Sequence, residues 1–423
     1  MLRRIRVPFV IALLLGTGLV APAEAASAST SSTPIVVGGD GNLAVSAGVA
    51  QGFIAGIKRF NDAGGLDGRK IDFVGFLDDG FSPQTNLTNA QELVESKHVT
   101  VVAPFLSEIN TPATATYLAK AKVPFIGWAV SSGFTSDPKW GWGITGLQDN
   151  PNAQSIAGIQ QLLEFTHNAK TPSKLKVALI GENNASVIAT IDALKGDDEY
   201  AKTSVVYSGT PMAVIGTTNY APYAQTIISS GANEVTEVLD AADAVGLAAA
   251  LKSAGYKGII MNGTTYLPGQ LASQPSEAAA LNGVLVEDEF PADENNTPAT
   301  KQAIKDLEAT GQAPYLSTGV SVGYWSAILL EQMLKATLAK VGGDPDKVTG
   351  TTIDSTVNSG FTYAPPLAGG ISTMYFPAEE TLPTGCLTLL KVSGTTYKQV
   401  YPYQCEGVAN LAKGRSYNLK TGK

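Results

Sequence analysis

The sequence predicts an α/β protein with two Rossmann-like lobes, each built on a mostly parallel sheet and joined by a hinge. Three observations lead to this prediction. The chain has 423 residues, which is too long for one ordinary hydrophobic core. Hydrophobic residues make up 44% of it and charged residues only 16%, as in a folded globular protein. Strand-like and helix-like stretches alternate in two series, which predicts two parallel sheets covered by helices on both faces.

The first series opens with a short apolar strand. The helix after it carries Val49 and Phe53 on its apolar face, and Gly64-Gly65 ends it. Ser82-Pro83 begins a second helix, because a capping residue precedes a first-turn proline there. The predicted strands of this series are 34–37, 70–76, 99–102 and 123–126.

The second series follows a stretch that contains glycine, tryptophan and proline. Its predicted helices are 152–166, 185–195, 221–230 and 242–254, and its predicted strands are 175–180, 203–207, 234–239 and 257–261. Strand 283–286 then leads into an acidic connector, Glu287-Asp288-Glu289. A long helix, 320–339, and a Pro/Gly-rich stretch, 359–370, follow. We interpret these later segments as crossings between the lobes.

The N-terminus has the features of a signal peptide. Arg3, Arg4 and Arg6 precede an apolar run, Val7–Val20, and Ala23-Glu24-Ala25 offers a cleavage site. The run is shorter than the ~20 residues that a membrane span needs. The domains expected from the sequence are a signal peptide (1–25), a flexible leader (26–33), lobe 1 (34–148 and 288–365), lobe 2 (149–287 and 366–412) and a C-terminal tail (413–423).

Charge and cysteine content narrow the classes of partner. The formal net charge is −8, and the three arginines and one glutamate of residues 1–25 contribute +2, so the exported chain carries −10. An acidic surface without basic clusters argues against nucleic acid or an anionic membrane as partner. Cys386 and Cys405 flank a predicted hairpin, and export makes a disulfide between them the expectation.

Two motifs point to enzymes, but neither is complete. Gly319-Val320-Ser321-Val322-Gly323 matches the nucleophile elbow of hydrolases, which needs a histidine base. The two histidines, His98 and His167, both precede it, and the motif lies in a predicted helix, so we read its glycines as packing residues. A glycine-rich turn at 39–44 is a weak dinucleotide pattern. We therefore expect no catalysis, no cofactor and no metal site; the acidic pairs and triplets are read as solvated loops.

Several segments resemble type I periplasmic solute-binding proteins of ABC importers, in particular the leucine/isoleucine/valine-binding branch. The resemblance covers residues 34 to 400. It is carried by Asn61-Asp62-Ala63-Gly64-Gly65-Leu66-Asp67-Gly68-Arg69, by Leu77-Asp78-Asp79, by Ala103-Pro104-Phe105-Leu106-Ser107 and by Thr111-Pro112-Ala113. It implies two lobes that close over a ligand in the cleft between them.

The resemblance also implies how the first lobe holds its ligand. In the family a serine after the third strand holds the ligand's carboxylate at a helix N-terminus, and Ser107 falls at that position. A second hydroxyl follows the fourth strand, where this chain has Ser131. Leu106 and Ala129 neighbour these residues as further candidate contacts. Trp128 is expected either to form an aromatic wall of the site or to lie in the core.

The second lobe departs from the family pattern. The residue matching a tyrosine of amino-acid-binding relatives is Ser186, and Thr264 lies where an acidic residue would pair with the ligand's ammonium. A closed cleft must satisfy a buried ammonium, so Asp240 or Asp243 would have to replace that residue. The alternative is a ligand without an ammonium, such as an aromatic or short carboxylic acid or an amide.

The function expected from the sequence is an exported, monomeric substrate-binding protein that delivers a small carboxylate, such as a branched-chain amino acid, to a membrane permease. Two other classes remain open at this point. A ligand-binding sensor domain shares the fold, and a secreted hydrolase would need a triad that the histidines do not supply.

Overall fold

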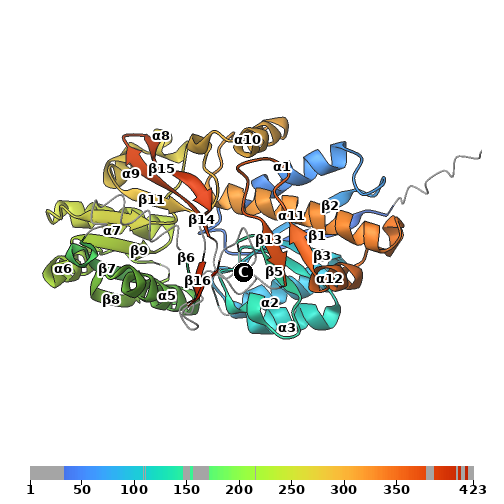
Figure 1. The fold of residues 1–423 in the computed structure, drawn as a ribbon, viewed down its shortest axis with the longest axis horizontal. Helices are drawn as coiled ribbons and strands as arrows, with labels where there is room; N and C mark the ends of the chain where they lie inside the picture. The colour runs from blue at the N-terminus through green and yellow to red at the C-terminus, as the bar shows by residue number, and fades with distance from the viewer. Residues whose placement is uncertain are drawn as a thin grey trace, which may run out of the picture.

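The computed structural model contains two lobes, which lie side by side along the long axis of the molecule (Figure 1). The residues described are 33–107, 109, 111–145, 153–155, 171–214, 216–377, 385–405, 408–410 and 415–417. Each lobe has a mostly parallel sheet between layers of helices. The two-lobed α/β fold predicted from the sequence is therefore confirmed.

The first lobe is built on a five-stranded parallel sheet with the order β2-β1-β3-β4-β5. Its strands are β1 (Ile35–Gly41), β2 (Ile71–Asp78), β3 (Val101–Leu106), β4 (Phe125–Gly127) and β5 (Gly141–Gly143). One core contains residues of α1 (Val49–Asp62), α10 (Pro298–Ala309), α11 (Thr318–Lys340) and α12 (Gly350–Asn358). The other contains residues of α2 (Pro83–Gln91), the π-helical turn η1 (Glu92–Ser96) and α3 (Pro112–Ala121).

The second lobe is built on a seven-stranded sheet with the order β15-β14-β11-β10-β9-β7-β8. Its parallel strands are β7 (Lys176–Glu182), β8 (Ser204–Met212), β9 (Glu234–Val238), β10 (Ile259–Asn262) and β11 (Leu285–Asp288). One face is covered by α6 (Ala221–Ser230), α7 (Ala241–Ser253), α8 (Gln270–Ser273) and α9 (Pro275–Leu281). The helix α5 (Ala185–Ala201) packs on the other face, because alternate residues of β7 point to opposite sides.

The C-terminal hairpin completes the sheet of the second lobe. It consists of β14 (Cys386–Ser393) and β15 (Thr396–Cys405), and β14 pairs antiparallel with β11. Cys386 lies opposite Cys405 in the ladder, and the two residues form a disulfide.

Shorter elements complete the described fold. They are η2 (Ser132–Thr135), η3 (Pro172–Lys174), η4 (Asp293–Asn295), η5 (Pro345–Lys347), β12 (Phe361–Tyr363), β13 (Met374–Phe376), β6 (Ala153–Ser155), β16 (Val408–Asn410) and β17 (Arg415–Tyr417). The stretch 371–376 was assigned to lobe 2 from the sequence, but β13 pairs with β12 in the core of the first lobe. A helix was predicted to begin at residue 152, but β6 is a strand because it pairs with β16, far along the chain. The rest of that predicted helix lies outside the described residues.

Glycines allow α1 and α11 to pack closely. A Cβ atom at Gly52 would lie 2.0 Å from the carbonyl oxygen of Val320, and one at Gly323 would lie 1.9 Å from that of Val49. Only a residue without a side chain fits such an approach between backbones. The nucleophile-elbow pattern at 319–323 lies inside α11, and its glycines serve helix packing, as the sequence predicted.

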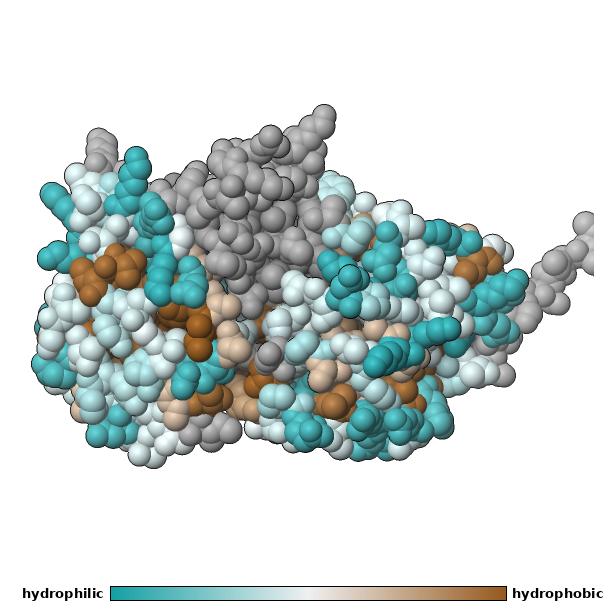
Figure 2. All heavy atoms as spheres, turned by 90° about the horizontal axis from the view of Figure 1, so that it is seen from below, coloured by the Kyte–Doolittle hydropathy of each residue, from teal (hydrophilic) through white to brown (hydrophobic). Residues whose placement is uncertain are grey.

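The described surface in Figure 2 is mostly hydrophilic, with smaller apolar patches between the polar side chains. The longest described helix, α11, has 23 residues and is largely buried within the first lobe. Among the described residues, no helix has both the length and the apolar character that crossing a membrane requires.

Candidate functional site

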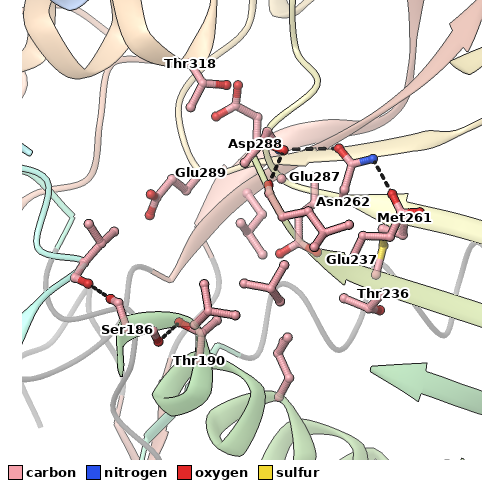
Figure 3. Close-up of a pocket in the computed structure, with 18 of the residues that line it drawn as sticks. Ser186, Thr190, Thr236, Glu237, Met261, Asn262, Glu287, Asp288, Glu289 and Thr318 are labelled. Atoms are coloured by element: carbon pink, nitrogen blue, oxygen red, sulfur yellow. Dashed lines mark hydrogen bonds between the residues drawn. The ribbon is translucent and has the colours of Figure 1, made fainter. Parts of the chain in front are cut away.

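A cavity of about 200 Å³ lies between the two lobes. Trp128, Val130 and Thr318 line it from the first lobe, and the second lobe supplies the other described lining residues (Figure 3). An apolar cavity of about 150 Å³ is enough to hold benzene. The space therefore suits a molecule with a single ring or a short branched chain.

Three neighbouring strands of the second lobe place polar side chains at this cavity. These side chains belong to Glu237 in β9, Asn262 at the end of β10 and Asp288 at the end of β11. The amide nitrogen of Asn262 donates to the Glu237 carboxyl at 3.2 Å (Figure 3). The Thr265 hydroxyl donates to the Asn262 oxygen at 2.7 Å. The Phe290 backbone N–H donates to Asp288 at 2.9 Å. These polar groups meet because the carboxyl ends of parallel strands lie at one edge of a sheet.

Four carboxyl groups line the described part of the cavity, and burial raises the pKa of each. It raises the pKa of Glu237 to about 8, that of Glu287 to about 7 and that of Asp288 to about 8. For Glu289, burial and the neighbouring Asp288 raise the pKa well above its usual value. A hydrogen bond with Thr145 lowers the pKa but does not offset this rise. Burial disfavours the charged form of a carboxyl group and raises its pKa. A cation bound nearby would act in the opposite direction and favour the ionised form.

The position of these acidic residues corrects one prediction. The triplet 287–289 was interpreted as a solvated connector between the lobes. Glu287 and Asp288 instead belong to β11, and Asp288 and Glu289 are buried. The local sequence looks like a polar loop, but β11 is an inner strand, between β10 and β14. Leu285, Val286 and Asp288 of this strand are therefore buried, and Glu287 is half-buried.

Three of the predicted contact residues line the cavity: Trp128, Ser186 and Thr264. The indole of Trp128 packs edge-on against the ring of Phe290, with centroids 5.9 Å apart, so it is both a cavity wall and a packing residue. The Ser186 hydroxyl donates to the backbone carbonyl of Val130, a contact between the two lobes (Figure 3). The Thr264 hydroxyl donates to the carbonyl of Leu239 at 2.8 Å.

The other predicted contacts of the first lobe, Ser107, Ser131, Leu106 and Ala129, do not line this cavity. Ser107 is fully buried and its hydroxyl donates to Asp79 at 2.6 Å. The Ser131 hydroxyl is buried and lies 3.1 Å from that of Thr111, the N-cap of α3. Leu106 and Ala129 are buried in the two cores of the lobe. The role of these four residues in ligand binding stays a prediction.

Asp79 is the centre of a buried polar cluster in the first lobe. Besides Ser107, its carboxyl accepts hydrogen bonds from the Asn86 amide at 3.2 Å and the Phe81 backbone N–H at 2.9 Å. Burial raises its pKa, and these bonds oppose that shift. Asp79 was read as part of a solvated acidic loop, but only its neighbour Asp78 is exposed. The difference arises because β2 ends beneath α2, whose Asn86 points back to Asp79.

Asp240 and Asp243, the predicted replacements for the acidic residue, lie at the start of α7. Asp240 caps that helix by accepting from the backbone N–H of Asp243 at 2.7 Å. Its own N–H donates to Glu182 at 2.7 Å, and Tyr220 donates to Asp243 at 2.8 Å. Carboxyl oxygens of the three acids lie within 4.8 Å of one another, the only such group of possible metal ligands among the described residues.

Glu237, Asn262 and Asp288 were not predicted as site residues from the sequence. A usable signal was present, because each is a polar residue within two residues of the C-terminal end of a predicted strand. In a parallel sheet those ends share one edge, so the three positions could have been grouped.

Comparison with known proteins agrees with this architecture. A solute-binding protein from R. palustris in complex with 4-hydroxybenzoate is similar in structure, with a TM-score of 0.66 and 20% identity over 88% of this chain and 96% of the other. For a fatty acid ABC transporter substrate-binding protein from Thermomonospora curvata the TM-score is 0.71. The identity is 17%, over 91% of this chain and 95% of the other. A branched-chain amino acid ABC transporter protein from Thermus thermophilus with bound valine has a TM-score of 0.68. The identity is 16%, over 90% of this chain and 98% of the other.

These likenesses concern the fold. No curated protein sequence matches the chain. The family model described as "Periplasmic binding protein" matches residues 36–396, which cover both lobes from β1 to the start of β15. The chain therefore belongs to the periplasmic binding protein family.

Proposed function

We propose that this chain is the extracytoplasmic substrate-binding component of an ABC importer. The observation that carries the proposal is the cavity enclosed by side chains of both lobes. Residues 1–25, with the composition of a signal peptide, direct export. The protein acts as a monomer, delivers its ligand to a membrane permease and carries out no chemistry on it.

The size of the cavity supports capture of a small organic molecule. About 200 Å³ of space suits molecules such as valine or 4-hydroxybenzoate, which are bound in two of the structural relatives. The two lobes enclose such a ligand from opposite sides. Affinity then comes from a few placed hydrogen bonds and from apolar contact in a site that excludes water.

The contact between Ser186 and Val130 supports a closing motion. It joins the lobes next to the cavity, so a hinge opening breaks it and closure restores it. A typical hydrogen bond adds a net ~1 kcal/mol. This is small, so the affinity of the ligand for the closed form dominates the balance between the open and closed forms.

The test uses the chain from residue 26 onward in a thermal-shift screen of amines, amino acids, amides, aromatic acids and short carboxylates. A ligand that binds only the folded state raises the melting temperature with its concentration. Gly263→Phe should abolish the response, because Gly263 lines the cavity and an added Cβ there meets only the Glu287 carbonyl, at 3.5 Å.

The control is Ser229→Phe, which adds the same ring to an exposed position of α6. It should respond like the wild type. Conversion of the ligand into a product would contradict the proposal. So would the absence of any binder, or binding that survives Gly263→Phe.

A further inference from the structure

The cavity has acidic side chains in its described lining and no basic ones. Glu237, Glu287, Asp288 and Glu289 line it, whereas its described lining includes no lysine, arginine or histidine. Lys252 acts on Glu237 electrostatically, but its ammonium group donates to the carbonyls of Ala280 and Asn282, outside the lining. The described lining thus contains several acidic side chains and no basic side chain.

Two of these carboxyl groups keep an oxygen without a hydrogen bond. Glu237 accepts from Asn262 through Oε2 only, and Asp288 accepts from the Phe290 N–H through Oδ1 only. The other oxygens, Oε1 of Glu237 and Oδ2 of Asp288, have no hydrogen-bond partner. Both are buried, and each residue is only 2% exposed. Buried polar atoms in folded proteins nearly always have partners, so a missing donor is implied at this place.

Among the described residues of the first lobe, only Trp128 and Thr318 bring a side-chain hydrogen-bond donor to the cavity lining, and neither carries a positive charge. The donors around Asp79, which include Ser107 and Asn86, converge on that internal carboxyl group. Ser107, the residue expected to hold a ligand's carboxylate, is therefore engaged by a carboxyl group of the protein itself. A ligand carboxylate in the cavity would face four acidic side chains.

The rest of the lining fits an apolar body. The ring of Trp128 forms one wall, and aliphatic side chains that include Leu194, Val238 and Met261 form others. A cation next to an indole face gains about 0.5 to 2 kcal/mol or more, depending on how far it is desolvated. The cavity thus combines donor-seeking carboxyl groups with an aromatic and aliphatic surface.

We propose that the cavity binds a small protonated organic amine that has a single ring or a short branched chain and no carboxylate, with Glu237 and Asp288 holding the ammonium group. This inference rests on the proposed function, because it names the ligand class of the same cavity. The ammonium supplies the donors that Oε1 of Glu237 and Oδ2 of Asp288 lack.

The test compares ligands that differ in charge and little else. Benzylamine, benzyl alcohol and benzoate share one ring, and 3-methylbutylamine is leucine without its carboxylate. Isothermal titration calorimetry with the chain from residue 26 onward should detect both amines. Benzoate and leucine should bind at least about tenfold more weakly, which corresponds to about one charge-assisted hydrogen bond.

Two amide variants test the residues. Glu237→Gln and Asp288→Asn keep the acceptors for Asn262 and Phe290 but remove the charge, and each should weaken benzylamine binding by about 10- to 100-fold. The matched control is Glu234→Gln, a buried carboxyl group on the same strand as Glu237 but outside the cavity lining. It should leave the affinity for benzylamine unchanged.

The outcomes separate the inference from the proposed function. Binding of benzoate or leucine without binding of either amine overturns the amine inference and leaves ligand capture standing. If benzylamine binds equally to the wild type, Glu237→Gln and Asp288→Asn, the assignment of the two carboxyl groups is wrong. If none of these compounds and no member of the wider screen binds, both proposals fail.

Discussion

Replacing Asp288 by asparagine should make the stability of the protein less dependent on pH. Burial raises the pKa of Asp288 to about 8, from a usual value of 3.8. Between pH 5 and pH 7 the group is therefore protonated in the folded protein and ionised in the unfolded chain. Unfolding then releases a proton, so stability falls as the pH rises, by about 1.4 kcal/mol per pH unit and about 2.7 kcal/mol over this range.

The assay is urea unfolding of wild type and Asp288→Asn at pH 5 and pH 7. The wild type should lose about 2.7 kcal/mol more than the variant between the two pH values. Asp344→Asn is the control, because the Asp344 side chain is 42% exposed and a hydrogen bond with Lys347 lowers its pKa. That group is ionised in both states throughout the range, so its removal should not alter the pH dependence. An equal loss in wild type and Asp288→Asn would refute the argument that Asp288 is buried and neutral.

Three further predictions concern stability, measured by urea unfolding. Replacing both Cys386 and Cys405 by serine should cost about 3 kcal/mol, because the disulfide closes a loop over a sequence separation of 19 in the unfolded chain. Gly323→Ala should cost about 1 to 3 kcal/mol or more, since its Cβ would force α1 and α11 apart. Ser107→Ala should cost about 1 to 3 kcal/mol by removing a donor from the buried Asp79, and unchanged affinity for the ligand would show that Ser107 is structural.

Local patterns predicted most of the fold because the elements of this chain carry clear signals. Helix α6 was predicted at 221–230, and the structure has Ala221–Ser230. The capping signal at Ser82-Pro83 was also correct, since the Ser82 side chain accepts from the Thr85 backbone N–H. Apolar periodicity and capping are local properties, and they need no knowledge of the distant chain.

The site was harder to predict because it depends on burial by distant segments. Asp288 reads as part of a polar loop, yet β14, about a hundred residues later, pairs with β11, so Asp288 lies in an inner strand and is buried. Ser107 was placed by a resemblance to the family, but the resemblance gave no information on which group its hydroxyl meets. The pairing with Asp79 needs the ends of β2 and β3 to lie near one another, and only the three-dimensional structure supplies that contact.

The raised pKa values of Glu237 and Asp288 determine how the affinity for a charged ligand changes with pH. At pH 7 a carboxyl group of pKa about 8, such as Glu237 or Asp288, costs about 1.4 kcal/mol to ionise, and a hydrogen bond to a charged group returns about 1.5 to 3 kcal/mol. An ammonium therefore binds with a net gain and releases protons, so its affinity rises with pH up to about 8. A carboxylate would instead need the protonated groups as donors, and its affinity would fall over the same range. The sign of the pH dependence thus distinguishes the two ligand classes independently of any substitution.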